Sequence, residues 1–264
     1  MRLPGDIDVA MAMAVWRRNL TLYRRTWVMN ILPNFFEPLL YLVGMGVGLG
    51  AYLGEEVGGM SYLAFIAPGL MAAAAMNGAV FETTYNVFIK MNYQRIYDAY
   101  LGTPAQIQDI MFGELLWATT RAAIYGCAFL VVVAALSFGA GMNMITSWWA
   151  LLIPVAVLGT GMLFAAIGAA FTSMIKVIDL FSYFYTLFLT PLFLFSGIFF
   201  PVSRFAYGEQ IAFFTPLYHA VRVIRSLAHG TVDASTGISV VWILAVTMLL
   251  YAIIPGRMRK TLAR

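Results

Sequence analysis

Six long apolar stretches follow one another along the chain, and only short polar segments separate most of them. A bilayer core of about 30 Å requires about 20 apolar residues for each helical crossing. The pattern therefore predicts an all-α integral membrane protein with six transmembrane helices in one domain, residues 1–264. The predicted spans are 29–53, 61–82, 109–137, 148–174, 178–200 and 238–255. Six crossings place both termini on the same side of the membrane.

Composition agrees with this pattern, because 62% of the residues are hydrophobic and only 11% are charged. These fractions exclude an ordinary water-soluble fold. Residues 1–28 lack the basic start, short apolar core and cleavage site of a signal peptide, so we expect this segment to be retained. Cys127, the single cysteine, falls inside the third predicted span, which excludes an intrachain disulfide and a cysteine-based metal site.

The distribution of basic residues predicts the orientation of the chain. With cytoplasmic termini, twelve Lys and Arg residues lie inside and three lie outside, as the positive-inside rule favours. The inside set is Arg2, Arg17, Arg18, Arg24, Arg25, Lys90, Arg95, Lys176, Arg257, Arg259, Lys260 and Arg264; the outside set is Arg204, Arg222 and Arg225, and Arg121 falls within a span. The basic residues flank spans and form no stripe interleaved with aromatics, so the net charge of +4 does not indicate nucleic-acid binding.

Three segments outside the spans have patterns of their own. Residues 7–27 mix apolar and arginine positions, which fits either an amphipathic interfacial helix or a basic flank of the first span. Residues 91–101 predict a short cytoplasmic helix with an aromatic face, stopped by Gly102 and Pro104. That helix fits a groove on another protein or an anchor at the membrane interface. Residues 201–236 predict two short exterior helices that dip into the outer leaflet, interrupted at Pro216.

Small residues recur at four-residue spacing in the first and fourth predicted spans, where they allow another helix to approach closely. They are Gly44, Gly46, Gly48 and Gly50 in the first span, and Gly161, Ala165, Gly168 and Thr172 in the fourth.

No catalytic motif is recognisable in the sequence. His219 and His229 have no Cys or carboxylate cluster at metal-ligand spacing, and the interpretation is that both are structural. None of the lysines follows a phosphate-binding glycine-rich loop. We therefore predict no metal and no cofactor in this chain, and any nucleotide hydrolysis must occur on another chain.

Ionisable residues in or beside the spans are the strongest functional indication from residue types alone, because hydrocarbon penalises charge that faces neither protein nor water. The candidates are Glu37, Glu82, Asp109, Glu114, Arg121 and Asp179. Glu114 and Arg121 lie seven residues apart on one predicted helix, two turns from each other, so each is expected to pair with a different helix. Two interpretations of these residues remain open: structural ion pairs and contacts with a substrate.

The chain resembles the permease subunit of type 2 ABC exporters, and within that family the branch that exports nodulation factors, drugs and polysaccharides. The resemblance covers nearly the whole chain, in order, through RRNLTLYRRTW, EPLLYLVGMGVGLG, FIAPGLMAAAAMN, YLGTPAQIQDIMFGELLWATTRA, FLFSGIFFPVSRF and TPLYHAVRVIRSL. It implies an N-terminal interfacial helix, a cytoplasmic coupling helix near 92–101 and paired re-entrant helices near 204–230. It further implies a bacterial inner-membrane location and a dimer of permeases, here a homodimer, with two separate ATPase subunits that carry ATP and Mg. Exported substrates would be amphiphilic or lipid-linked.

The resemblance also implies roles for particular residues. The expected contacts with the ATPase subunit are Tyr93, Arg95, Tyr97, Asp98, Tyr100, Leu101, Thr103 and Pro104. The expected lining of a translocation path along spans one, two and five is Tyr41, Asn77, Tyr85, Tyr183, Tyr185 and Phe188. Two other classes remain as alternatives: a self-contained secondary transporter or channel, which would show broken helices in repeated halves, and an intramembrane enzyme, which would need a reactive pair near the midplane.

Overall fold

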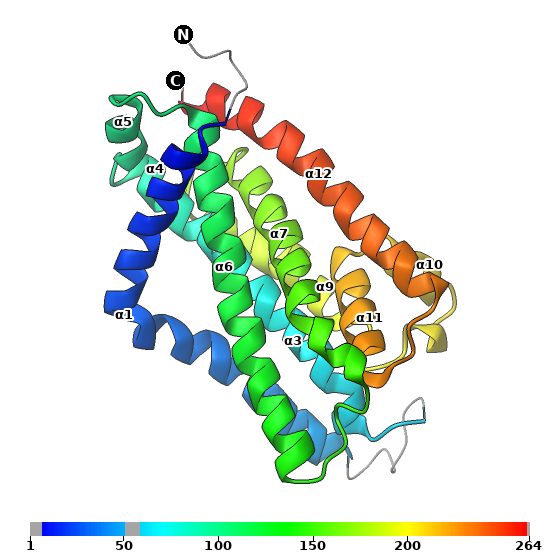
Figure 1. The fold of residues 1–264 in the computed structure, drawn as a ribbon. Coiled ribbons are helices and arrows are strands. Elements are labelled where there is room, and N and C mark those ends of the chain that lie inside the picture. The colour runs from blue at the N-terminus through cyan, green and yellow to red at the C-terminus, as the bar shows by residue number, and fades with distance from the viewer. Residues whose placement is uncertain (1–6, 51–58, 263–264) are drawn as a thin grey trace.

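The computed structural model describes residues 7–50 and 59–262, and all regular secondary structure in these ranges is helical (Figure 1). The elements up to the middle of the chain are α1 (Val9–Val43), η1 (Gly44–Leu49), α3 (Tyr62–Phe81), η2 (Glu82–Asn86), α4 (Val87–Asn92), α5 (Ile96–Leu101), α6 (Ile107–Ala134) and η3 (Ala135–Gly139). The remaining elements are η4 (Trp148–Leu152), α7 (Ile153–Thr172), α8 (Leu180–Tyr183), η5 (Phe184–Leu189), α9 (Thr190–Phe195), η6 (Val202–Arg204), α10 (Gly208–Phe213), α11 (Pro216–His229) and α12 (Ala234–Leu262). The prediction of an all-α membrane protein is confirmed.

Five helical segments in the described residues are long and apolar enough to cross a membrane. Four of them overlap most or all of the predicted spans 61–82, 109–137, 148–174 and 238–255, and the fifth, Val9–Gly46, overlaps most of the described part of span 29–53. The predicted fifth span, 178–200, forms only the shorter apolar helix Leu180–Phe195. It ends at a turn where Gly197 adopts a φ of +76°, which favours glycine. The count of six crossings therefore stays a prediction.

The N-terminal amphipathic segment and the first span form one long helix, α1, that bends at Thr26. Thr26 has φ −125° and ψ 16°, outside the helical range, so the two parts run in different directions. The side chain of Asn30 donates to the carbonyl of Thr26 at 2.8 Å and thus satisfies a polar group beside the bend. Figure 1 shows the bend in the blue helix.

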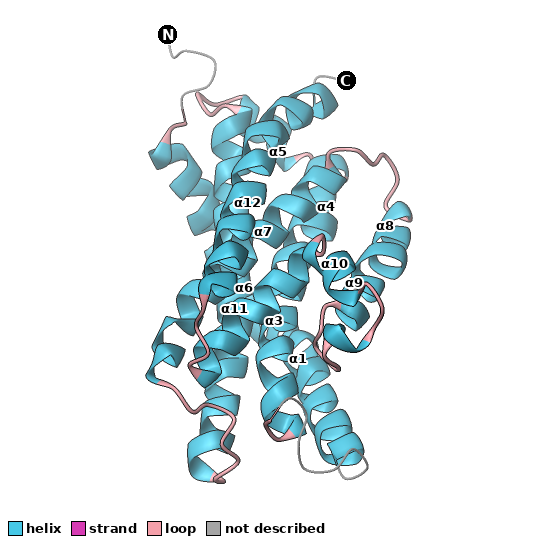
Figure 2. Cartoon of the chain, turned by 90° about the vertical axis from the view of Figure 1, so that its right-hand side faces the viewer, coloured by secondary structure: helices cyan, strands magenta, loops and turns pink. Residues whose placement is uncertain are grey.

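α3 is the central helix of the bundle and packs against α1, α6, α7 and α11. Most of its residues are buried inside the chain itself, which explains its many alanines: small side chains let the surrounding helices approach closely. Both described ends of the chain lie at one end of the bundle, together with α4 and α5 (Figures 1 and 2). The sequence predicts both termini on the same side of the membrane, because an even number of crossings returns the chain to the side where it began.

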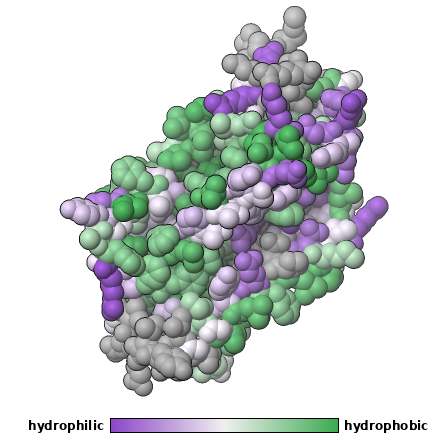
Figure 3. Space-filling model, turned by 180° about the vertical axis from the view of Figure 1, so that it is seen from behind, coloured by the Kyte–Doolittle hydropathy of each residue, from purple (hydrophilic) through white to green (hydrophobic). Residues whose placement is uncertain are grey.

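Large apolar side chains cover the outside of the bundle, as lipid contact requires. Met29, Val131, Leu151 and Met248 are all exposed on the outer surfaces of apolar helices. Hydrophobic residues cover large areas of the face seen in Figure 3, and hydrophilic residues lie at its margins and in a band across its middle. The exposed apolar side chains thus suit contact with lipid on the outer faces of these helices.

The two predicted small-residue faces behave differently. An added Cβ at Gly168 would collide with the side chain of Thr83, and one at Gly161 would meet the Cβ of Ala122. The face on α7 therefore permits close packing on η2 and α6. The first span is divided: an added Cβ at Gly46 would collide with the side chain of Leu63 on α3, whereas one at Gly44 or Gly48 meets nothing within 4 Å.

We expect Gly168→Val to lower the free energy of unfolding by about 1–3 kcal/mol, the usual cost of overpacking a tight contact. Gly159→Val on the same helix is the matched control, because a Cβ there meets nothing within 4 Å. The measurement is the thermal unfolding midpoint of both variants in one detergent. Equal midpoints for the two variants would show that the α7 contact contributes nothing.

Two short helices, α10 and α11, occupy the segment before α12, as the sequence predicted. Pro216 starts α11 at a position where its missing N–H costs no hydrogen bond. α11 is amphipathic and packs on α3, α7 and α12. Its insertion into the outer leaflet stays a prediction.

Candidate functional site

Lys90 lies at the centre of a buried charge network where the extension of α3 meets α6. Its Nζ is 2.8 Å from Oε1 of Glu82 and 2.7 Å from Oε2 of Glu114. Nη1 of Arg121 is 2.6 Å from the other oxygen of Glu82. Two acids and two bases balance one another, which is the condition for holding charge in an apolar interior. These four residues are called the charge network below.

A π-helical turn places Glu82 and Lys90 on the same face. In an uninterrupted α-helix, side chains eight residues apart point about 80° away from each other. The π turn η2 inserts one residue, so that the pair behaves like positions seven apart and differs by only about 20°. The wider turn exposes the carbonyl of Thr83, which accepts a hydrogen bond of 2.7 Å from Thr172 on α7.

Asparagine and tyrosine side chains connect the charge network to α1 on both sides of its bend. Nδ2 of Asn19, before the bend, donates to Oε2 of Glu114 at 2.9 Å. Arg121 Nη2 donates to the hydroxyl of Tyr125 at 2.6 Å, and that hydroxyl donates to the carbonyl of Asn30 at 3.0 Å, after the bend. The network therefore links the amphipathic part of α1, the first span, the π turn and α6.

The structure settles several of the sequence expectations about charged residues. Glu114 pairs with Lys90 and Arg121 with Glu82, so neither pairs with the other, and both partners lie on the one helical segment Tyr62–Asn92. The predicted end of the second span at residue 82 leaves Lys90 outside it, whereas in the structure η2 and α4 continue the helix through Asn92 and Lys90 is buried. The sequence does show an acid and a base eight residues apart, Glu82 and Lys90. Because the second span was predicted to end at residue 82, the two residues were not expected to lie on one helix.

The remaining charged candidates have other roles. Asp109 caps α6: its Oδ2 accepts from the backbone N–H of Gln106 at 2.9 Å, and its Oδ1 accepts from that of Asp8 at 2.6 Å. Asp179 is exposed in the loop before α8. Glu37 lines a cavity described below.

The predicted coupling segment turns sharply between α4 and α5. Arg95 adopts the left-handed conformation, with φ 49°, where the chain reverses into α5. α5 ends before Gly102, as the sequence predicted. The exposed side chains of the expected contact set are Tyr93, Arg95, Asp98, Leu101, Thr103 and Pro104, and Tyr100 is half-buried.

Tyr97 differs from the rest of this set because it is 0% exposed. Its ring points into the chain, and burial, followed by the charges of Glu114 and Glu82, raises the pKa of its phenol well above the usual range. The phenol is therefore neutral at physiological pH. In this conformation Tyr97 is a contact between α5 and the charge network, and the surface available to another protein consists of its exposed neighbours.

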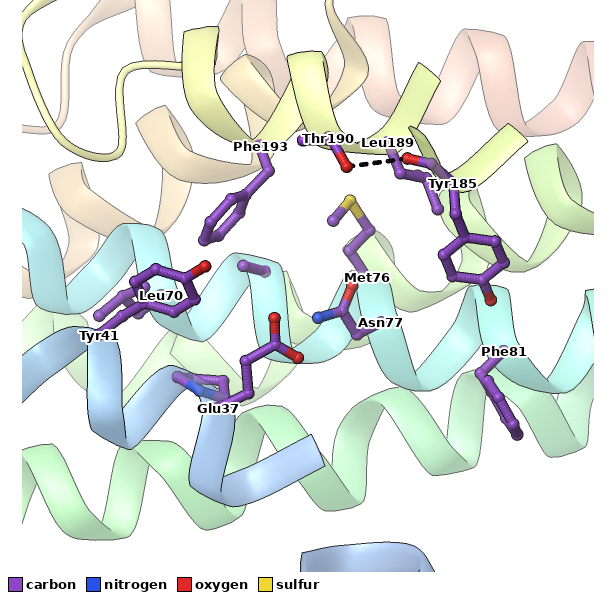
Figure 4. Close-up of a pocket in the computed structure, with 12 residues that line it drawn as sticks. Glu37, Tyr41, Leu70, Met76, Asn77, Phe81, Tyr185, Leu189, Thr190 and Phe193 are labelled. Carbon is purple, nitrogen blue, oxygen red and sulfur yellow. Dashed lines mark hydrogen bonds between the residues drawn. The ribbon is translucent and has the colours of Figure 1, made fainter. Parts of the chain in front are cut away.

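A cavity of about 290 Å³ opens between α1, α3 and the η5–α9 segment (Figure 4). Its lining is Glu37, Pro38, Tyr41, Leu70, Ala73, Met76, Asn77, Phe81, Tyr185, Leu189, Thr190 and Phe193. Apolar and aromatic groups dominate this lining, and Glu37 is its one charged member. In Figure 4, Glu37 and Asn77 project toward the same space from opposite sides. The cavity thus offers one polar centre within an apolar wall, as suits an amphiphile.

Three of the six expected path residues, Tyr41, Asn77 and Tyr185, line this cavity. The others are elsewhere: the ring of Tyr85 packs 5.0 Å from that of Phe181, and Tyr183 and Phe188 are exposed on the outer surface. The rotation of each helix about its own axis decides which of these side chains face the cavity. A sequence whose spans are apolar on all sides does not reveal that rotation.

Both histidines have structural contacts. Pro68 lies inside α3 and has no N–H, so the carbonyl of Ala64 lacks its usual helical donor. The Nε2 of His229 lies 3.2 Å from that carbonyl and contacts it instead. His219 stacks on Trp242 at 4.4 Å between ring centroids. Among the residues that the structure describes, no three His, Cys, Asp or Glu side chains form a group that could hold a metal ion.

Comparison with known proteins identifies the class to which this bundle belongs. The family described as ABC-2 type transporter matches residues 12–228. Nodulation protein J of Rhizobium leguminosarum bv. trifolii is 38% identical over 255 residues, covering 95% of this chain and 92% of that protein. Nodulation protein J of Rhizobium meliloti (strain 1021) is 35% identical over 253 residues, covering 95% and 92%.

A more distant relative is the inner membrane transport permease YadH of Escherichia coli (strain K12), which is 23% identical over 246 residues, covering 91% of this chain and 93% of that protein. No solved structure matches significantly. The family match over most of the chain, together with the identity to nodulation protein J, means that this chain belongs to the ABC-2 type transporter family. It is a multi-pass membrane transport subunit.

Proposed function

We propose that this chain is the transmembrane subunit of an ATP-driven exporter that moves amphiphilic or lipid-linked molecules outward across the bacterial inner membrane. The observation that carries the proposal is the family match over residues 12–228, in a chain whose described part has five apolar helices long enough to span a membrane. The similarity to an inner membrane transport permease supports the transport role and the location, and the amphiphilic substrate class rests on the apolar cavity with its single charge.

A separate ABC ATPase subunit would bind ATP and Mg and drive the cycle. Its contact surface on this chain would be the exposed part of the coupling segment, from Tyr93 to Pro104. Tyr97 would then transmit movement of α5 to the charge network, because it packs beneath that surface and beside Glu114. Through Asn19 and Tyr125 such movement would reach both parts of α1.

The cavity between α1, α3 and α9 is our candidate for part of the translocation path. Tyr41, Asn77 and Tyr185 line it and would contact the amphiphile, and Glu37 supplies its charge. A second copy of the chain would complete the path in a homodimer. Membrane lipid would cover the remaining apolar faces.

The proposed orientation places both termini and α5 in the cytoplasm. We expect a cysteine at position 98, in a Cys127→Ser background, to react with an impermeant maleimide only after the cells are permeabilised. Asp98 is the suitable position because it is exposed, whereas Tyr97 is buried. Tyr207→Cys, on the predicted exterior, should react in intact cells. Labelling of position 98 from outside intact cells would contradict this orientation.

The direct test of the function is purification and reconstitution. We expect the tagged chain to copurify with an ABC ATPase and, in inverted vesicles, to accumulate a lipid-linked oligosaccharide only when ATP and Mg are present. A self-contained transporter or channel would instead move substrate without any partner ATPase. Transport by the chain alone, equal with and without ATP, would therefore refute the proposal.

A further inference from the structure

A second cavity, of about 220 Å³, lies beside α11, away from the charge network, and its lining contains two arginines. Arg222 and Arg225 on α11 contribute to its lining, with the hydroxyl groups of Ser203, Ser226 and Thr231. No carboxylate is among the lining residues, so their formal charge is +2. At about 30 Å³ for each water-sized group, the space holds roughly seven such groups.

Backbone carbonyls hold Arg225 in position. Its Nη2 donates at 2.9 Å to the carbonyls of Phe65 and Gly197, and its Nε donates to Phe65 at 3.2 Å. The guanidinium carbon lies 4.0 Å from the centroid of the Phe65 ring, a cation–π contact. Nη1 has no hydrogen-bond partner among the described residues. The cation is therefore fixed in place without an acid to neutralise it.

Arg222 lies one turn before Arg225, and no carboxylate of the described residues forms an ion pair with it within 4.0 Å. Its Nη1 donates to the hydroxyl of Tyr218 at 3.2 Å, and its guanidinium lies 5.8 Å from the centroid of that ring. Hydrogen bonds from Ser235 and Thr236, and to a smaller extent the charge of Arg222, lower the pKa of Asp233, which directly precedes α12. Its Oδ1 already accepts from the N–H of Thr236 at 2.9 Å and from the hydroxyl of Ser235 at 2.5 Å.

We propose that this cavity binds a phosphate-type oxyanion between the guanidinium groups of Arg222 and Arg225. Arginine donates pairs of hydrogen bonds to such oxygens, and the hydroxyls of Ser226 and Thr231 can donate to others. The Ser226 hydroxyl lies 3.0 Å from that of Thr236, which is also 2.9 Å from Oδ1 of Asp233, so a hydroxyl relay connects the cavity wall to this carboxylate. The oxyanion belongs either to a lipid headgroup or to a molecule free in water. The location of this site on the exterior side of the membrane rests on the proposed function. The binding of an oxyanion by the two arginines does not depend on that function.

The test uses the full-length chain in nanodiscs of phosphatidylcholine. One arm adds phosphatidylglycerol to the nanodisc lipid, and the other adds inorganic phosphate to the buffer. Native mass spectrometry counts retained anionic lipid, and the thermal unfolding midpoint reports binding in both arms. We expect Arg222→Gln to weaken binding about tenfold, as the loss of a charge-assisted pair predicts.

Arg204→Gln is the matched control, because it removes the same charge from an exposed position outside the cavity. Arg225→Lys tests the second cation while retaining its charge, and it should weaken binding less than Arg222→Gln. Retention of phosphatidylglycerol alone would assign the site to a lipid headgroup, and stabilisation by phosphate alone would assign it to a soluble oxyanion.

Two results would overturn the site: no effect of either probe on the wild-type chain, or equal weakening by Arg204→Gln and Arg222→Gln. Neither measurement uses ATP, an ATPase or a particular orientation. Failure of ATP-driven transport with intact binding would therefore count against the proposed exporter and leave this site standing.

Discussion

Replacing Lys90 with methionine is expected to lower the free energy of unfolding by about 3–5 kcal/mol and to abolish transport. The size follows from the cost of removing one partner of a buried ion pair. Lys90 bridges Glu82 and Glu114, so its loss leaves Glu114 without a cation and Glu82 with Arg121 alone. The measurement is the thermal unfolding midpoint in detergent, followed by transport in vesicles from material matched for folded protein.

Lys176→Met is the control for Lys90→Met, because Lys176 is exposed in the loop after α7 and the same charge is lost. A second variant separates charge from packing. Adding Glu114→Gln to Lys90→Met removes the unpaired carboxylate and should recover part of the lost stability. If Lys90→Met unfolds at the same temperature as Lys176→Met, the charge network does not stabilise the fold.

Replacing Tyr93 and Leu101 together with aspartate is expected to detach the partner ATPase while the membrane helices stay inserted. These side chains are 66% and 38% exposed, so the substitution perturbs the surface of the coupling segment and leaves its interior intact. Burial of each against a partner typically contributes about 1.5–3 kcal/mol. Losing both should weaken association at least about 100-fold. The measurement is copurified ATPase per inserted permease, together with transport.

Met174→Asp is the control for the coupling segment, because Met174 is an apolar side chain, 63% exposed, in the loop after α7. If the coupling segment were a lipid anchor, the double variant would insert poorly, but each inserted molecule would keep its ATPase. An unchanged ratio of ATPase to permease with normal export would defeat the docking proposal. Tyr97 is unsuitable for this test, because an aspartate there would disrupt the buried contact with the charge network.

Much of the architecture follows from local pattern. Apolar runs specify the long helices, since each needs enough apolar length to remain in hydrocarbon. Pro216 begins α11, where its fixed φ and missing N–H are tolerated, and Gly102 follows the end of α5. The family could also be predicted, because its motifs occur in order over the whole chain. These features depend on neighbouring residues alone, so a sequence contains the information for them.

The tertiary structure decided which polar groups meet. One added residue in a π turn aligns Lys90 with Glu82, and no composition or hydropathy pattern reveals that insertion. Tyr97 faces inward because α5 folds back over α6, whereas its spacing from Tyr100 and Leu101 had suggested one outer face. The length and location of most membrane helices were thus determined by the sequence of each segment. Their rotation, and with it the charge network and the lining of both cavities, was set by packing between segments distant in the chain.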